Sequence, residues 1–398
     1  MRRFCSVLCL AALPALLSSG PTATAAPVPT TPSGFTVASG ANLGAGASSQ
    51  FVGVVSPAPA DAWIGGSYRT GGTAHWQPLL EHWNGSTWTL VHPPLPAGTS
   101  DAFINSISET AANNIWIGGF ATVSGHDRTL LEHWNGSTWI QVVLPTTLKI
   151  SYVSSVAAAS STQVWFYGYN TRCNGRNDSF LYEYNVSAGT YAAKYKEDAC
   201  DAIPDGDVFY ATDATSANAG WWLGGLFLHE DDATATEANC YGSACPTRSA
   251  TIPGNFWGYY SDAIGTPTST WLIGGAQPAD PDSGIPIGWV QPLVSHWNGT
   301  GWTDASPSFG YTTTHEFNAG TLLANGTLWA IGERLTTTGS DRTLIEERTA
   351  GGAWSDLGGP NVGTGDNYLV GVAHVPGTAT AMWAVGSGGG EGLLLHHP

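Results

Sequence analysis

Basic residues are scarce in this chain. Its 398 residues include 13 Lys and Arg against 30 Asp and Glu, for a formal net charge of −17 at pH 7. Proteins that bind nucleic acids or anionic membranes use clustered Lys and Arg to neutralise phosphate groups. The composition therefore argues against both kinds of partner and favours a protein kept soluble by its negative charge.

Long apolar runs are also scarce, and the main one lies at the N-terminus. Two arginines precede an apolar run over residues 4–17, and Ala23-Thr24-Ala25 forms a small-x-small cleavage site. The run is shorter than the about 20 residues that a membrane-spanning helix needs. We therefore predict a signal peptide over residues 1–25, secretion to the extracellular space, and no membrane insertion.

Common catalytic motifs are missing as well. The chain contains no Gly-x-Ser-x-Gly nucleophile elbow, no His-Glu-x-x-His metal motif and no glycine-rich phosphate loop. A pair of carboxylates for glycoside hydrolysis stays open, because its two members need not be close in sequence.

What the chain does contain is a repeat. Seven times, an aromatic residue is followed 12 to 15 residues later by a Trp-x-x-Gly motif, with Trp63, Trp116, Trp165, Trp222, Trp271, Trp329 and Trp383. These tryptophans are 49 to 58 residues apart. A period near 50 with strand-forming content is typical of a β-propeller with one sheet per repeat. We therefore predict an all-β fold: one seven-bladed β-propeller of four-stranded antiparallel blades over residues 26–398.

The two ends of the chain predict how the ring closes. Repeat seven stops at its third strand, residues 393–397, so its fourth strand is missing. Residues 33–39 match the fourth strand of repeat five, residues 300–306. We expect this N-terminal strand to complete the last blade, because closing the ring removes exposed sheet edges.

Some polar residues recur around the ring. They are Glu81, Glu132, Glu183 and Glu346, together with His82, His133 and His296. A catalytic residue is needed once, so residues that recur in several blades are expected to be structural.

Four cysteines remain after the predicted cleavage. An even number in an exported chain indicates two disulfides. The repeat favours Cys173 with Cys200, both in repeat three, and Cys240 with Cys245, both in one loop. A zinc site is the alternative, but the spacings lack the close Cys-x-x-Cys pairs of such sites.

The repeat also resembles a known group of proteins. Its Trp-x-x-Gly and Glu-His-Trp-Asn-Gly-x-x-Trp segments resemble those of secreted actinobacterial propeller proteins and, more distantly, Kelch-type blades and the propeller of galactose oxidase. The resemblance covers the whole mature chain and implies the fold, but propellers have many different functions. The copper chemistry of galactose oxidase is not implied, because no cysteine is free for its Tyr–Cys cross-link. Sialidase-type Ser-x-Asp-x-Gly-x-x-Trp turns do not occur.

The long loops predict where a ligand binds. Loops between the second and third strands, and several between blades, are long, and both classes should emerge on one face. Polar residues at the starts of the innermost strands should ring the channel mouth there: Gln50, Asp101, Ser151, Asp207, Asn255, His315, Glu316, Asp366 and Asn367. Their carboxylates are suited to Ca²⁺, as in lactonase-type propellers. The alternative is a hydrated mouth without a metal.

Two further features lie on these loops. Trp76 in blade one and Trp289 in blade five fall outside the repeat. Such rings suit the apolar faces of sugars, unless each simply pins its own loop. In the irregular fourth repeat, residues 229–231 (His-Glu-Asp) are either an acid/base or metal cluster or a solvated acidic loop.

These observations predict a ligand site on the long-loop face. Its expected residues are Trp76, Trp289, Asp101, Asp207, His315, Glu316 and Asp366. The predicted function is that of a secreted, monomeric binding protein for a glycan or cell-surface polymer. The alternative is a secreted polysaccharide hydrolase or lyase, or a lactonase, that uses the mouth acids and Ca²⁺.

Overall fold

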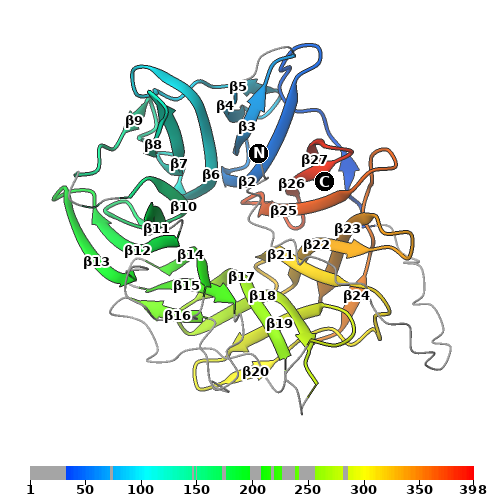
Figure 1. The fold of residues 1–398 in the computed structure, drawn as a ribbon. Helices are drawn as coiled ribbons and strands as arrows, with labels where there is room; N and C mark the ends of the chain where they lie inside the picture. The colour runs from blue at the N-terminus through cyan, green and yellow to red at the C-terminus, as the bar shows by residue number, and fades with distance from the viewer. Residues whose placement is uncertain are drawn as a thin grey trace.

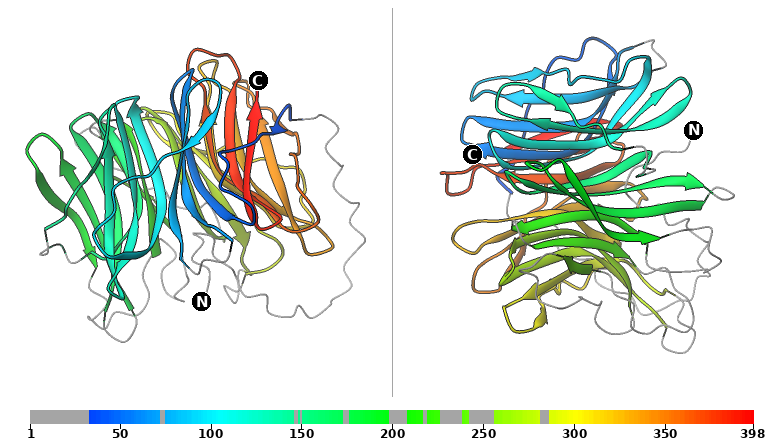
Figure 2. Two further views of the ribbon diagram at one scale, coloured as in Figure 1. Left: turned by 90° about the horizontal axis from the view of Figure 1, so that it is seen from above. Right: turned by 90° about the vertical axis from the view of Figure 1, so that its left-hand side faces the viewer.

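The computed structural model describes ten stretches of the chain, arranged around a central axis (Figure 1). They are residues 33–71, 75–145, 148, 150–172, 176–197, 208–216, 219–225, 238–241, 256–280 and 286–398. Their repeating elements are antiparallel β-strands, stacked around the ring in the side views of Figure 2. None of these stretches forms a helix of the length and apolarity needed to cross a membrane. The predicted signal peptide, Cys173, Cys200, Cys245 and the side chain of Cys240 lie outside the described residues.

Five sheets have four strands each. The first three are β2 (Ser48–Ala58), β3 (Asp61–Arg69), β4 (Gln77–Trp83) and β5 (Trp88–Leu90); β6 (Thr99–Ala111), β7 (Asn114–Val123), β8 (His126–Trp134) and β9 (Trp139–Gln141); and β10 (Tyr152–Ser160), β11 (Gln163–Arg172), β12 (Arg176–Asn185) and β13 (Thr190–Glu197). The other two are β21 (His315–Leu322), β22 (Leu328–Leu335), β23 (Asp341–Arg348) and β24 (Trp354–Asp356); and β25 (Asn367–His374), β26 (Met382–Gly388) and β27 (Glu391–His397) with β1 (Thr36–Val37). The prediction of an all-β propeller with four-stranded antiparallel blades is confirmed.

The number of blades differs from the prediction: the described residues form six sheets, not seven. Repeats four and five share one seven-stranded sheet. It contains β14 (Val208–Ser216), β15 (Ala219–Gly225), β16 (Ala238–Tyr241), β17 (Phe256–Thr266), β18 (Ser269–Pro278), β19 (Gln291–Trp297) and β20 (Trp302–Asp304). The short β16 pairs only with residues 220–223 of β15, so Gly225 is free to pair with Tyr259 of β17. This single pair joins the two repeats.

The repeated glycine is required by a bulge in each innermost strand. In β21 the register shifts between Phe317 and Ala319, opposite Gly332 of β22. A Cβ on Gly332 would lie 2.0 Å from the Glu316 carbonyl oxygen, and one on Gly119 would lie 1.9 Å from that of Phe103. No side chain fits there, so the glycine is needed for a close approach between two strands of the same sheet. The bulge also fixes the backbone of the residue that precedes it, such as Glu316 in β21.

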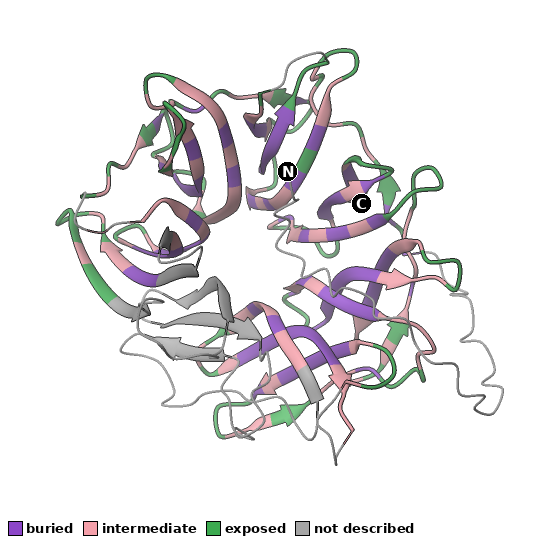
Figure 3. Cartoon of the chain, in the orientation of Figure 1, coloured by how far each residue is buried: buried purple, intermediate pink, exposed green. Residues whose placement is uncertain are grey.

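The recurring histidines stack on the recurring tryptophans within a blade. Buried positions alternate with partly exposed ones along the innermost strands (Figure 3). The rings of Trp63 and His82 stack 4.1 Å apart, and those of Trp116 and His133 4.3 Å apart. Glu183 departs from the expected pattern: it lies opposite Trp165, which is the place of His82 opposite Trp63. The histidines therefore have a packing role.

The N-terminal segment lies beside the last strand of the chain. Thr36 pairs with His396, and Val37 pairs with Leu395. Phe35 is buried, with its ring centroid 5.9 Å from that of Trp329 and 5.3 Å from that of His397. That this contact closes the ring stays a prediction.

Candidate functional site

Two long loops dock on the following blade in the same way. The Ala102 N–H donates to the Trp76 carbonyl oxygen at 3.0 Å, and the His315 N–H donates to the Val290 carbonyl oxygen at 2.9 Å. In both cases the next residue is a glutamine that starts the third strand. Trp76 and Val290 therefore occupy equivalent positions in their loops, and Trp289 precedes that position by one residue.

Asp101 and Asp366 hold loops in place. Asp101 Oδ1 accepts the Trp76 N–H at 2.8 Å, and its Oδ2 lies 3.0 Å from His75 Nδ1. Burial disfavours the charged carboxylate, but the bonds from Trp76 and His75 outweigh it, so the pKa of Asp101 lies below its usual value. Asp366 Oδ1 accepts the Asp341 N–H at 3.2 Å. Two predicted ligand residues thus have a structural role.

Trp76 begins a row of aromatic rings across three blades. The Arg69 guanidinium lies 5.0 Å from the Trp76 ring centroid, and the Phe103 ring lies 5.8 Å from it. The row continues through Phe120, Tyr152 and Tyr169, with 4.8 Å between successive centroids from Phe103 onward. Two of these pairs are stacked, so many ring faces meet one another. This aromatic row packs the blades and partly buries Trp76.

Trp289 has a different environment. Its side chain is 47% exposed, and Ile287 in the same loop is 48% exposed. The loop is fixed by bonds from Gln277 Nε2 to the Gly288 carbonyl oxygen at 3.0 Å and from the Ile287 N–H to the Pro278 carbonyl oxygen at 2.7 Å. Trp289 is therefore an exposed ring on a well-held loop.

Two buried glutamates lie beside each other at the start of the blade formed by β21–β24. Glu316 of β21 lies directly opposite Glu333 of β22, and both are at most 9% exposed. Burial, and then the hydrogen bond and charge of Glu316, raise the pKa of Glu333 far above its usual range. Glu333 is therefore protonated at neutral pH and donates a hydrogen bond to Glu316. The Tyr259 hydroxyl also donates to Glu316 Oε2.

Further acids influence this acid pair of Glu316 and Glu333. Burial, and then the charges of Asp366 and Glu316, raise the pKa of Asp341 to about 6. The sequence predicted Glu316 and Asp366 but missed Glu333, Asp341 and Tyr259. A signal for Glu333 was present: it follows the repeat glycine, where the other described blades have Ser67, Phe120, Tyr169, Gly275 and Ser387.

The loop that carries the exposed tryptophan lies close to Glu316. A Cβ placed on Gly275 would lie 2.9 Å from Val290 Cγ1, 3.2 Å from the Tyr259 hydroxyl oxygen and 3.3 Å from Glu316 Cβ. These three groups therefore gather around one point of the backbone. Trp289 is the neighbour of Val290, so its loop borders the acid pair.

His315 is engaged in the structure. It is 5% exposed, its Nδ1 lies 2.9 Å from the Thr313 carbonyl oxygen, and its ring centroid lies 4.3 Å from that of Tyr311. Burial lowers the pKa of His315, so the ring is neutral at pH 7. Its contacts support packing.

A metal at the mouth has no support from the described part of the chain. Within it, no three His, Cys, Asp or Glu side chains are placed to hold an ion together. Asp207, Asn255 and residues 229–231 lie outside the described residues, so the expected roles of these residues stay predictions.

Comparison with known proteins gives the fold. No protein-family model and no curated protein matches the sequence. The chain is similar in structure to oligogalacturonate lyase from Vibrio parahaemolyticus, with TM-score 0.54, 7% identity, and coverage of 94% of this chain and 98% of that chain. It is also similar to the β-propeller domain of the Trilobed protease from Pyrococcus furiosus (TM-score 0.49, 5% identity, coverage 87% and 95%). A third is SapL1 lectin in complex with α-methyl fucoside (TM-score 0.38, 10% identity, coverage 84% and 87%). At these identities the likeness extends to the propeller architecture alone.

Proposed function

We propose that this chain is a secreted glycan-binding propeller and that its ligand sits on the loop of Trp289. The observation that supports this most is an indole 47% exposed on a loop that borders the buried acid pair. Sugar recognition needs an apolar face for the ring and directed polar groups for the hydroxyls. Trp289 offers the first. Glu316, Glu333 and Tyr259 offer the second.

The acidic side chains around the acid pair make some classes of glycan better ligands than others. Besides burial, the charges of Glu316 and Asp366 raise the pKa values of Glu333 and Asp341. A polymer of uronic acids would add like charge to this group, which is unfavourable. A neutral glycan, or one with amino groups, is therefore the ligand we propose.

Replacing Trp289 by Ala should weaken binding to a retained polysaccharide by about tenfold or more, because stacked aromatic anchors dominate such interfaces. Its melting temperature should stay unchanged, because the ring is exposed. The matched control is Trp76→Ala, which removes a packed ring and should lower the melting temperature. Affinity electrophoresis in gels with neutral and amino polysaccharides measures the first effect, and thermal denaturation measures the second. Wild-type retention by Trp289→Ala would contradict the proposed platform.

A hydrolytic role is the second candidate, and the acid pair is the reason to consider it. Two carboxyl groups that share a proton can activate water, as in the aspartic proteases. Glycosidases instead need carboxyl groups about 5 Å or more apart, whereas Glu316 and Glu333 are hydrogen-bonded to each other. The pair therefore suits attack of water on a lactone or ester better than cleavage of a glycosidic bond.

If the pair is catalytic, Glu333→Gln should lower the rate of product release by about a hundredfold or more, the usual contribution of a general acid or base. Glycan binding should survive this change, because Gln still donates a hydrogen bond. The measurement is product release from a panel of lactones, acylated glycans and plain glycans. Absence of product with the wild-type protein across this panel would exclude the hydrolytic candidate and leave binding.

A further inference from the structure

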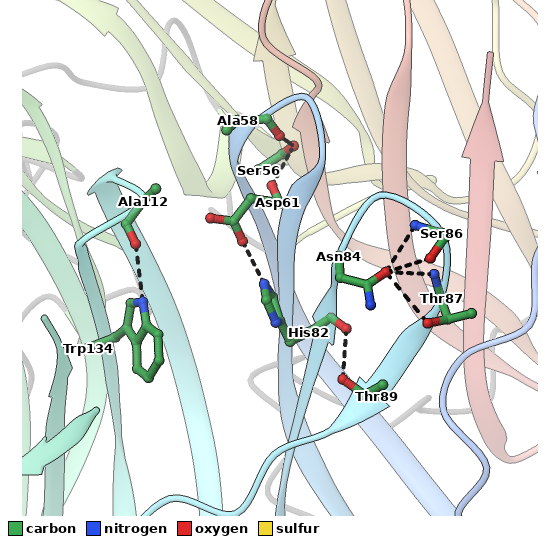
Figure 4. A network of polar contacts seen from close by, with 10 residues as sticks. All are labelled: Ser56, Ala58, Asp61, His82, Asn84, Ser86, Thr87, Thr89, Ala112 and Trp134. Carbon is green, nitrogen blue, oxygen red and sulfur yellow. Dashed lines mark hydrogen bonds and ion pairs between the residues drawn. The ribbon is translucent and has the colours of Figure 1, made fainter. Parts of the chain in front are cut away.

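Three hairpin turns share one unusual arrangement. Asn84, Asn135 and Asn298 each precede a glycine in an exposed turn between the third and fourth strands. The side-chain oxygen Oδ1 of Asn84 accepts short hydrogen bonds from Ser86 N at 3.0 Å, Ser86 Oγ at 2.8 Å and Thr87 N at 3.0 Å, and a longer one from Thr87 Oγ1 at 3.5 Å (Figure 4).

The other two turns repeat these contacts closely. Asn135 Oδ1 accepts from Ser137 N at 2.9 Å, Ser137 Oγ at 2.8 Å and Thr138 N at 3.0 Å. Asn298 Oδ1 accepts from Thr300 N at 3.0 Å, Thr300 Oγ1 at 2.8 Å and Gly301 N at 3.0 Å. Three donors around one carbonyl oxygen form an arrangement that stabilises negative charge on that oxygen.

The following glycine provides a nucleophile. Gly85, Gly136 and Gly299 all have φ near +90° (91°, 93° and 93°) and no side chain to shield the backbone nitrogen. None of their N–H groups donates a hydrogen bond among the contacts of the described residues. Each turn thus combines a polarised amide carbon with an unengaged neighbouring amide.

We infer that these three turns are sites of self-modification by deamidation. The backbone nitrogen of Gly85 attacks Cγ of Asn84, and the donors around Oδ1 stabilise the developing negative charge on that oxygen. The new N–Cγ bond forms as the Cγ–Nδ2 bond breaks, and the side-chain nitrogen leaves as ammonia with the proton from the glycine amide. Water then opens the cyclic imide to Asp or isoAsp. Asn135 and Asn298 react in the same way.

The chain contains its own control at a fourth Asn-Gly pair. Asn325 Oδ1 accepts from Thr327 N at 2.9 Å, and no hydroxyl is placed on it among the described contacts. The Gly326 N–H donates to the Leu323 carbonyl oxygen at 2.9 Å. The nucleophile is therefore engaged and the oxygen has fewer donors, so Asn325 reacts slowly in the folded protein.

The modification has a structural cost. Each event adds a negative charge, and isoAsp inserts a methylene into the backbone of the turn. The outer strands after these turns, β5, β9 and β20, have three residues each. A longer turn shifts the register of these outer strands. Their pairing with the third strands therefore weakens as the modification accumulates over time.

The test is peptide mapping of the purified full-length protein during incubation at mildly alkaline pH. Asn84, Asn135 and Asn298 should convert about tenfold faster than Asn325 in the folded protein, and all four should convert at similar rates in denaturant. Ser86→Ala removes one donor and should slow Asn84 about fivefold, with Asn135 as the unchanged internal reference.

Three results would overturn the inference. The first is equal conversion of Asn325 and Asn84 in the folded protein. The second is no conversion of the three turns while the denatured sample reacts. The third is a glycan on their side-chain nitrogens in protein from its native source, since Asn-x-Ser/Thr is also an acceptor sequence for N-linked glycans and a capped nitrogen does not leave.

Discussion

Replacing Glu132 by Gln should make the protein markedly more stable near pH 8 and change it little near pH 4.5. Glu132 is fully buried, and neither carboxylate oxygen has a hydrogen-bond partner among the described residues. Burial raises the pKa of Glu132 from its usual 4.5 to about 8. The unfolded chain releases this proton between those values while the folded chain keeps it, so stability falls as pH rises through this window. At about 1.4 kcal/mol per unit, the loss is roughly 4 kcal/mol, and Gln removes it.

The reason for this orphaned acid lies in one proline. In blade one, Glu81 Oε2 accepts the Ala41 N–H at 2.7 Å. The Ala38 N–H donates to the Leu394 carbonyl oxygen, and the Val91 N–H donates to the Leu80 carbonyl oxygen, so Ala38 and Val91 occupy equivalent positions. Ala41 lies three residues after Ala38. The residue three after Val91 is Pro94, which is therefore the counterpart of Ala41 for Glu132. Proline has no N–H to donate.

Pro94→Ala supplies the missing donor and should therefore flatten the pH dependence, although less than Glu132→Gln does. Urea denaturation between pH 4.5 and 8 measures both effects. The same slope in the wild type and in Glu132→Gln would contradict this account.

Deleting the chain up to Val37 should lower the melting temperature by about 10 °C. The deletion removes the β1–β27 pair and the buried ring of Phe35. Loss of a buried phenylalanine ring alone costs about 3–5 kcal/mol, and a protein of this size loses roughly 2 °C for each kcal/mol. It also exposes the edge of β27, which favours aggregation.

Two substitutions separate packing from strand pairing. Phe35→Ala should reproduce a large part of the loss, because the ring contacts Trp329 and His397. Val37→Ala should have almost no effect, because Val37 is 54% exposed. Differential scanning calorimetry gives the melting temperatures. A deletion variant that melts with the intact protein would refute the idea that this segment closes the ring.

The sequence predicted the propeller because its architecture is stored in short local signals. Tryptophans mark the packing between blades, and glycines mark the bulge of each innermost strand. The number of blades was not predictable, since it depends on one pair, Gly225 with Tyr259. No local pattern encodes that contact.

The residues of the candidate site were predicted only in part. Glu316 was found because it starts a strand, but Glu333 becomes its partner through cross-strand register. Trp76 and Trp289 looked alike in sequence, yet hydrogen bonding places Val290 where Trp76 lies. One ring is therefore packed and the other exposed. Such distinctions depend on a shift of one residue, which a repeat of variable length does not define.

The bulge opposite each repeat glycine gives one position at the start of the innermost strands a backbone that does not depend on its side chain. The backbone there is the same whether the preceding residue is Phe103, Tyr152, Tyr259, Glu316 or Tyr368. Its carbonyl approaches the glycine, and the frame takes no account of the side chain. Each blade therefore has one position whose side chain can be changed without changing the backbone of the blade. Evolution or protein design could therefore change the ligand chemistry of this scaffold by substituting one such position at a time.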